Sequence, residues 1–323
     1  MAKKSKAQID LEYAAARVAI GALSLLPLRM SLAAGRVFGA VAHLVGGRLR
    51  RTGERNLEMA LPDLDAAGRR RVLRGTFSSL GRQLGLFSQI GKLTRDNLSD
   101  VCVIEGFEHL RAARAGNRPV IMFTGHLGAW ELTAFAPSVL HYPLSFLVRR
   151  IDNPKLEDMV ERIRTRLGNR SIDKKAAARP MLRALNSGGT IGILIDLNSQ
   201  PHEGVFVDYF GIPASTSVGI ADLALRSNPI ILPIFAPWDA VRRKYVVRIE
   251  PPVEFEPTGV REDDARELTQ RMTAVIERYV RAYPDQWLWI HKRWNTRPPG
   301  EPDLYAARAE AAKTTPRASL EID

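Results

Sequence analysis

The chain has 323 residues, of which 45% are hydrophobic and 25% charged, with 24 glycines and 20 prolines, a composition that excludes collagen-like, low-complexity and wholly disordered chains. Its single cysteine, Cys102, excludes an intrachain disulfide and CxxC redox chemistry, and we expect it to be a small buried strand residue. The net charge of +12 favours an anionic partner, which could be a nucleic acid, an anionic membrane or an acidic protein.

Residues 1–52 are basic and apolar, and we expect them to attach the chain to a membrane. The apolar stretches 18–28 and 37–47 are eleven residues long, whereas a helix that crosses a bilayer needs about 20 apolar residues. The pattern therefore favours a surface or re-entrant hairpin, whose headgroup-level side chains would be Arg29, Arg36, Arg48, Arg50 and Arg51. Two buried helices of an ordinary core are the alternative.

From residue 63 onward the pattern is that of an α/β protein. Apolar spacing predicts a helix over about 63–93, a second that begins near Pro154, and a third over about 261–282. Short apolar runs predict strands at 120–123, 144–148, 191–195, 230–235 and 245–249. Alternating strands and helices indicate a mostly parallel central sheet with flanking helices. We expect one main domain over 53–298 and a flexible polar tail over 299–323.

Three of the predicted strands are followed by polar side chains. His126 follows the first, Arg149 and Arg150 the second, and Asp196 the third. Ligands bind beyond the carboxyl ends of parallel strands, so a base, a cation and an acid would share one cleft. Arg164, on the following helix, could reach this cleft or lie along the surface. Structural ion pairs are the alternative for the arginines and for Asp196.

His126 is followed five positions later by Glu131. Five residues of a regular helix rotate about 500°, so the two side chains cannot meet within one helix, and His126 must precede it. The carboxylate of Glu131 could then reach back to one ring nitrogen and leave the other to accept a proton, as a general base requires. A hydrogen-bonded turn histidine beside a solvated glutamate is the alternative. No partner histidine suggests a zinc site.

Five segments carry a resemblance to a known family. They are 55–62 (RNLEMALP), 126–131 (HLGAWE), 149–154 (RRIDNP), 204–213 (GVFVDYFGIP) and 284–298 (PDQWLWIHKRWNTRP). In this order they resemble the late acyltransferases of bacterial lipid A biosynthesis, the lauroyl and myristoyl transferases, which are related to lysophospholipid and glycerolipid acyltransferases. The resemblance covers nearly the whole chain and makes 53–298 a catalytic domain.

This resemblance implies transfer of a fatty acyl group to a hydroxyl of a membrane lipid at the cytoplasmic face of the bacterial inner membrane. The donor would be acyl carrier protein, with no cofactor beyond this thioester co-substrate and no metal. His126 would be the catalytic base and Glu131 its orienting carboxylate, and the further site residues would be Arg149, Arg164 and Asp196. Side chains that could lie at the membrane interface are Trp130, Trp238, Trp287, Trp289 and Trp294. For Trp130 and Trp287 a position in the core is an equal alternative.

The chain departs from the family pattern at three positions. Val148 stands where a tyrosine is usual, Arg150 replaces a proline, and Asn198 replaces the second acid of a doubled pair. The acceptor could therefore differ from a lipid A precursor. The alternatives are an acyl-CoA-dependent enzyme that acylates another glycolipid or an aminolipid, and a non-catalytic membrane-bound partner protein. A nucleic-acid partner is not expected, because the basic residues are spread along the chain without a recognised motif.

Overall fold

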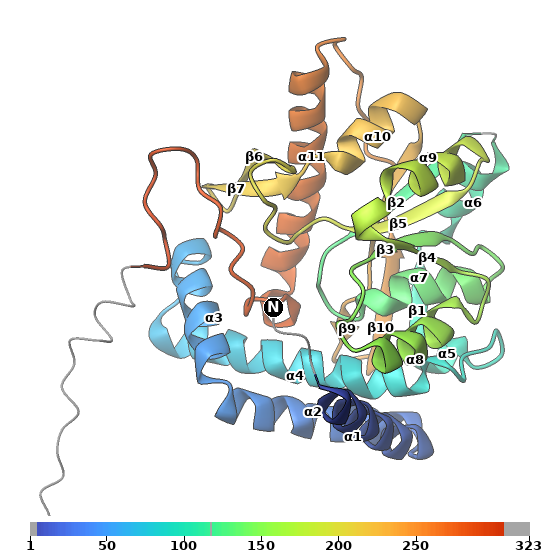
Figure 1. Ribbon diagram of the computed structural model, residues 1–323, viewed down its shortest axis with the longest axis vertical. Helices are drawn as coiled ribbons and strands as arrows, with labels where there is room; N and C mark the ends of the chain where they lie inside the picture. Colours follow the sequence, from blue (N-terminus) through green and yellow to red (C-terminus); the bar gives the residue numbers. More distant parts are fainter. Residues whose placement is uncertain (1–4, 117, 307–323) are drawn as a thin grey trace, which may run out of the picture.

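A mostly parallel eight-stranded sheet forms the centre of the computed structural model, which describes residues 5–116 and 118–306 (Figure 1). The path through the sheet is β1-β10-β8-β2-β5-β3-β4, and β9 pairs with β10. Within this sheet, as far as the described residues go, the β10–β8 and β10–β9 pairs are antiparallel and the other pairs are parallel. The strand bounds are β1 Cys102–Glu105, β2 Val120–Thr124, β3 Ser145–Val148, β4 Arg170–Asp173, β5 Thr190–Leu194, β8 Ile230–Phe235, β9 Trp238–Asp239 and β10 Lys244–Ile249.

The predicted α/β class and all five predicted strands are confirmed, as β2, β3, β5, β8 and β10. Cys102 is a buried residue of β1, as expected. Strand β4 has no apolar run, because Arg170 and Asp173 stand at its two ends. The separate hairpin of β6 (Gly204–Tyr209) and β7 (Ile212–Ser217) was also not predicted as strands. Its short, mixed polar and apolar strands give only a weak periodic signal.

Helices cover both faces of the sheet. Side chains alternate along β2, so that Ile121 and Phe123 face one hydrophobic cluster and Val120 and Met122 face the other. The first cluster includes side chains of α9, α10 and α11, and the second includes side chains of α5, α6 and α7. The bounds are α5 Leu98–Val101, α6 Phe107–Ala115, α7 Trp130–Val139, α8 Pro154–Thr165, α9 Ala178–Asn186, α10 Gly219–Ser227 and α11 Arg261–Ala282, with 3₁₀ turns at Lys174–Ala176 and Pro284–Gln286.

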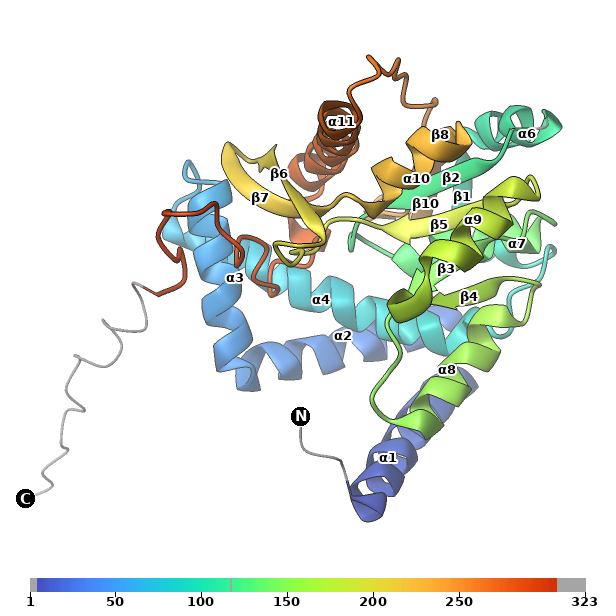
Figure 2. The same cartoon turned by 45° about the horizontal axis from the view of Figure 1, so that its top comes forward.

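Four N-terminal helices form a further layer. Figure 2 shows the first, second and fourth of them beneath the sheet and the third standing at the left of the molecule. The four helices are α1 Lys6–Leu25, α2 Leu28–Val45, α3 Gly47–Ala60 and α4 Ala66–Ile90. Helix α2 runs along α4, and glycines make the contact. A Cβ on Gly35 would lie closer than 3.0 Å to the carbonyl oxygen of Gly81, and one on Gly85 equally close to that of Ser31. The two backbones therefore pack with no side chain between them.

The outer faces of α1 and α2 are apolar and exposed. Large exposed side chains along them are Leu11, Val18, Leu25, Met30, Val37, Phe38, Val41, Leu44 and Val45. This exposure does not fit two helices buried in an ordinary core. In the described part of the chain, α2 is the one helix whose length and composition would permit a membrane crossing, and 22% of it is buried. The division at residues 52 and 298 stays a prediction, and most of the expected tail, 307–323, lies outside the described residues.

Candidate active site

His126 and Asp196 form the centre of the site. Strands β2 and β5 are parallel neighbours with Thr124 opposite Leu194, so the residues two positions beyond each strand emerge side by side. His126 Nδ1 lies 2.8 Å from Asp196 Oδ1, and the backbone N–H of His126 donates to Oδ2 at 2.6 Å. The expected meeting of a base and an acid at this edge of the sheet is confirmed.

Asp196 is almost completely buried, with 2% of its surface exposed. Burial raises the pKa of its carboxyl, but the positive charge that His126 carries when protonated and the hydrogen bonds from His126 and Trp287 outweigh burial, so the pKa lies below its usual value. The indole Nε1–H of Trp287 donates to Oδ2 at 2.7 Å. Asp196 is therefore a carboxylate with three donors around it, and it fixes the orientation of the imidazole.

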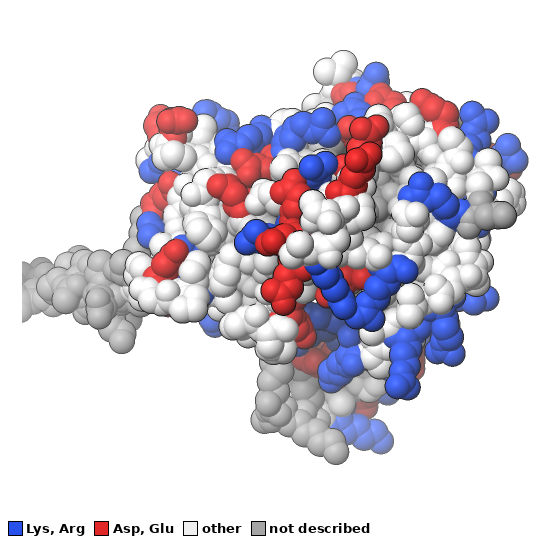
Figure 3. Space-filling view, turned by 90° about the horizontal axis from the view of Figure 1, so that it is seen from above, with Lys and Arg blue, Asp and Glu red and all other residues white. Residues whose placement is uncertain are grey.

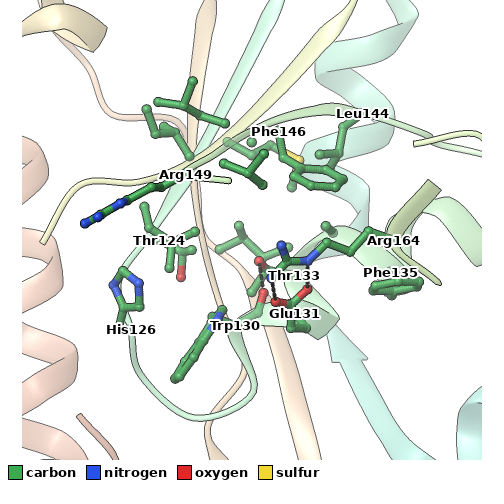
Figure 4. Close-up of a pocket in the computed structure, with 18 residues that line it drawn as sticks. Thr124, His126, Trp130, Glu131, Thr133, Phe135, Leu144, Phe146, Arg149 and Arg164 are labelled. Atoms are coloured by element: carbon green, nitrogen blue, oxygen red, sulfur yellow. Dashed lines mark hydrogen bonds and ion pairs between the residues drawn. The ribbon is translucent and has the colours of Figure 1, made fainter. Parts of the chain in front are cut away.

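The expected contact between Glu131 and the ring of His126 is wrong. Glu131 lies in the first turn of α7 and accepts from Arg164 of α8, with Nε to Oε2 at 3.1 Å and a second bond from Nη2 to Oε1. Figure 4 shows this bidentate pair on the cavity side, away from the His126 ring. Along the sequence Glu131 is the acid close to His126, but the register of β2 and β5 brings Asp196 to Nδ1 of the His126 ring. Arg164 does reach the cleft.

The segment that follows α11 supports the histidine loop, which sequence analysis did not foresee. The N–H of Gly128 donates to the carbonyl of Gln286 at 3.0 Å, and the N–H of Leu288 donates to that of His126 at 3.1 Å. Trp287 thus reaches Asp196 from a segment paired with the loop itself. The sequence feature that could have indicated this contact is a tryptophan within a polar segment, because the N–H of a buried indole needs a hydrogen-bond acceptor.

The expectation of a membrane-interface position is wrong for Trp289 and Trp294, and for Trp287 the core alternative is confirmed. Trp287, Trp289 and Trp294 are 0–1% exposed and belong to the hydrophobic cluster that also contains Tyr209 and Phe210.

Asn198, which stands where the family pattern has the second acid, forms hydrogen bonds with other residues of the protein. Its backbone N–H donates to His291 Nε2 at 3.1 Å, and its side-chain Oδ1 accepts from the backbone N–H of Thr296 at 2.9 Å.

A cavity of about 260 Å³ opens beside His126 and continues between the sheet and α7 (Figure 4). Polar groups line it at His126, Arg149 and the Glu131–Arg164 pair, and the rest of its wall is mostly apolar, including Met122, Phe135, Leu144, Phe146, Ile193 and Ile234. Gly192 of β5 also lines it, and a Cβ there would lie 2.9 Å from Leu144 Cδ1. The shape and lining suit an alkyl chain whose reactive end lies near the histidine.

The two arginines after β3 have different surroundings. Arg149 is exposed and lines the cavity, and Figure 4 shows its side chain at the same end as His126. Arg150 points elsewhere and forms a surface ion pair with Asp173, with Nε to Oδ2 at 3.0 Å. Of the two, Arg149 is therefore the cation that the site can use.

A histidine oriented by a buried carboxylate at the mouth of an apolar cavity is typical of an enzyme that activates a hydroxyl next to an apolar substrate. Comparison with known proteins identifies that enzyme class. The family model described as "Bacterial lipid A biosynthesis acyltransferase" matches residues 1–296, and the chain belongs to this family. The predicted resemblance is confirmed, and the protein is an O-acyltransferase of a membrane-associated family.

Several curated relatives match over most of their length. A lipid A biosynthesis lauroyltransferase of Escherichia coli is 27% identical over 307 residues, which is 94% of this chain and 98% of the relative. A lipid A biosynthesis acyltransferase of Haemophilus influenzae is 24% identical over 289 residues, covering 88% and 87%. A lipid A biosynthesis palmitoleoyltransferase of Escherichia coli is 26% identical over 281 residues, covering 87% and 90%.

Proposed function

We propose that the protein transfers a fatty acyl group from acyl carrier protein to a hydroxyl of a membrane glycolipid of the lipid A precursor type. The observation that carries this proposal is the His126–Asp196 pair at the mouth of an apolar cavity. The names of the relatives support the same class of acceptor, since they are acyltransferases of lipid A biosynthesis. No cofactor is needed for this reaction beyond the thioester co-substrate.

His126 acts as the general base. Asp196 accepts the Nδ1–H of the imidazole, so the lone pair of Nε2 is available to the acceptor hydroxyl. As Nε2 takes the hydroxyl proton, the oxygen attacks the thioester carbonyl carbon and a tetrahedral intermediate forms. The carbon–sulfur bond then breaks, and the leaving thiolate takes the proton from the imidazolium. The products are the acyl ester and the free thiol, and no covalent enzyme intermediate is required.

Arg149 stabilises the negative charge on the oxygen of the tetrahedral intermediate. It lines the same cavity as His126 and brings a guanidinium group to the reacting end. The amino end of α7, which begins at Trp130 four positions after His126, adds its positive dipole end to the same region. A thioester is reactive enough for positioning, a base and this charge to carry the reaction.

The acyl chain of the donor lies in the apolar part of the cavity. Glu131 and Arg164 pair within the cavity wall, and their side chains are 12% and 23% exposed. They join the first turn of α7 to α8, so they hold the two sides of the cavity at a fixed separation. We therefore assign them a positioning role.

The acidic carrier protein docks on a basic surface beside the cavity. Segment 162–183 has eight basic residues and one acidic residue, Asp173. The exposed basic residues, which we call the basic face, are Arg162, Arg166, Arg170, Lys174, Lys175, Arg179 and Arg183. Figure 3 shows Lys and Arg side chains gathered over this side of the molecule, around α8 and α9. Complementary charge of this kind steers association.

The exposed apolar faces of α1 and α2 attach the enzyme to the cytoplasmic face of the inner membrane. Apolar surface buried in the interface and basic side chains near anionic headgroups both favour this attachment. The acceptor lipid then stays in the bilayer while the soluble carrier protein approaches from the cytoplasm.

The experiment that tests this function presents both donors to the purified full-length protein. Labelled acyl carrier protein and labelled acyl-CoA are incubated in parallel with a bacterial total lipid extract, using wild type and His126→Ala. We expect acylated glycolipid from acyl carrier protein, with a rate loss of about 2 to 4 orders of magnitude in the variant. Transfer from acyl-CoA alone would refute the donor assignment, and equal product from both proteins would refute the role of His126.

A further inference from the structure

A second pocket, of about 400 Å³, lies between α2, α4 and the segment that includes β9. Four arginines from three separate parts of the chain line it: Arg29, Arg36, Arg82 and Arg243. Arg29 and Arg36 are seven residues apart on α2, so they lie on one side of that helix. The pocket shares no lining residue with the cavity beside His126.

The positive charge of this pocket is not balanced by the protein. Asp285 is the one acidic residue in its lining, against four arginines. In the described part of the chain, none of the four guanidinium groups makes an ion pair with a carboxylate. Arg36 donates to Ser78 Oγ at 3.1 Å, and the guanidinium of Arg82 stacks 4.5 Å from the ring centre of Trp238.

Arg82 shows that this charge concentration has a cost. Burial lowers the pKa of its guanidinium, and the nearby charge of Arg36 lowers it further, while Asp285 acts in the opposite direction. Partly buried cations without a carboxylate partner are unfavourable unless an external anion approaches them. Convergent arginines present planar, paired N–H donors, which match the oxygens of a phosphate group.

An apolar groove continues from the pocket along α2. It has a volume of about 580 Å³, and its lining includes Ala33 and Arg36, which also line the arginine pocket. Its apolar residues Val37, Ala40 and Leu44 belong to the exposed side of α2. A ligand that fits both spaces has an anionic head and an apolar tail.

We propose that the arginine pocket binds the phosphate headgroup of a membrane lipid, whose acyl chains lie in the groove along α2. This site is separate from the acyl-transfer site, and it holds the N-terminal helices at a defined depth in the bilayer. Because lipid binding can be measured without any acyl donor, failure of this proposal and failure of the proposed reaction are distinguishable.

The test uses native mass spectrometry of the full-length protein in a neutral detergent, titrated with phosphatidylglycerol or phosphatidylcholine. The variant Arg29→Gln/Arg36→Gln/Arg243→Gln removes three pocket charges at exposed positions. The control, Arg95→Gln/Arg111→Gln/Arg266→Gln, removes three exposed charges elsewhere. We expect phosphatidylglycerol to bind the pocket variant about tenfold or more weakly than wild type and the control. Equal binding by the pocket and control variants would overturn the proposal.

A second variant separates a lipid from free phosphate. Ala33→Trp fills the junction between pocket and groove but leaves the four arginines in place. Inorganic phosphate is added to each protein as a probe, and thermal unfolding reports its binding. We expect Ala33→Trp to weaken phosphatidylglycerol binding and to leave the shift with phosphate unchanged. If Ala33→Trp binds phosphatidylglycerol as wild type does, the groove holds no acyl chain and the lipid assignment is wrong.

Discussion

Replacing Asp196 by asparagine tests the proposed catalytic role of the His126–Asp196 pair. In the structure Oδ2 accepts from the His126 backbone and from Trp287, whereas Oδ1 accepts from the His126 ring. The asparagine oxygen must take the Oδ2 position, since two donors point at it. Its NH₂ group then faces Nδ1, which must become an acceptor, and the ring proton moves to Nε2. The nitrogen that should accept the hydroxyl proton is thus blocked.

We expect this change of tautomer to lower kcat about 10³- to 10⁴-fold. The histidine keeps its position, but the nitrogen that faces the hydroxyl already carries a proton and cannot accept another. The matched variant is Glu131→Gln, which removes a carboxylate from the same cavity without touching the His126 ring. It leaves Arg164 without its partner, so we expect lower stability and a higher KM, with a much smaller loss of kcat.

Single-turnover transfer from a labelled thioester measures both variants, and thermal unfolding shows whether each is folded. Nitrogen-15 NMR of the histidine rings reports the tautomer directly, with the proton of His126 on Nδ1 in wild type and on Nε2 in Asp196→Asn. If Asp196→Asn keeps most of its turnover while Glu131→Gln loses 10³-fold, the reasoning from strand register is refuted and Glu131 is the supporting carboxylate.

Three further predictions concern the cavity, the pH dependence of stability and the N-terminal layer. Gly192→Val should shift the preference toward shorter acyl chains, because new methyl groups enter the cavity, and competition between thioesters of different length measures this. Burial lowers the pKa of His291 from 6.5 to about 4. Between these pH values His291 is protonated in the unfolded chain but not in the folded protein, so acid favours unfolding. Stability should therefore fall by about 3 kcal/mol from pH 6.5 to 4, and urea unfolding should show a flatter profile for His291→Gln. Gly81→Ala places a methyl group against the backbone of Gly35, so it should lower the free energy of unfolding by about 1 to 3 kcal/mol and make α2 more susceptible to protease. Gly91→Ala, the control, has open space around its new methyl group and should change neither the free energy of unfolding nor the cleavage of α2.

The sheet and the composition of the site were predictable, since each depends on local sequence. Apolar runs bounded by polar residues gave the strands, and the rule for parallel strands placed His126, Arg149 and Asp196 at one edge. Which acid contacts the histidine was not predictable, because it depends on the pairing of Thr124 with Leu194 across the sheet. Register between distant strands has no counterpart in the spacing of residues along the chain.

The support from Trp287 was missed for a similar reason. It requires that residues 286–288 pair with the loop that begins at His126, a contact between parts of the chain some 160 residues apart. The glycines that join α2 to α4 also have no periodic pattern that marks them as a contact, and only the meeting of the two backbones shows why Gly35 and Gly81 lack side chains.

The pairing of residues 286–288 with the histidine loop also orders events during synthesis. The apolar helices α1 and α2 leave the ribosome before the strands of the sheet, and under the proposed attachment they reach the membrane while most of the chain is still unmade. Asp196, by contrast, gains its bond from Trp287 only when translation has passed that residue, near the end of the described chain. If this attachment holds, the growing polypeptide meets its lipid surface before the loop of His126, the proposed base, is held in place, and a truncated product would occupy the membrane without an ordered site.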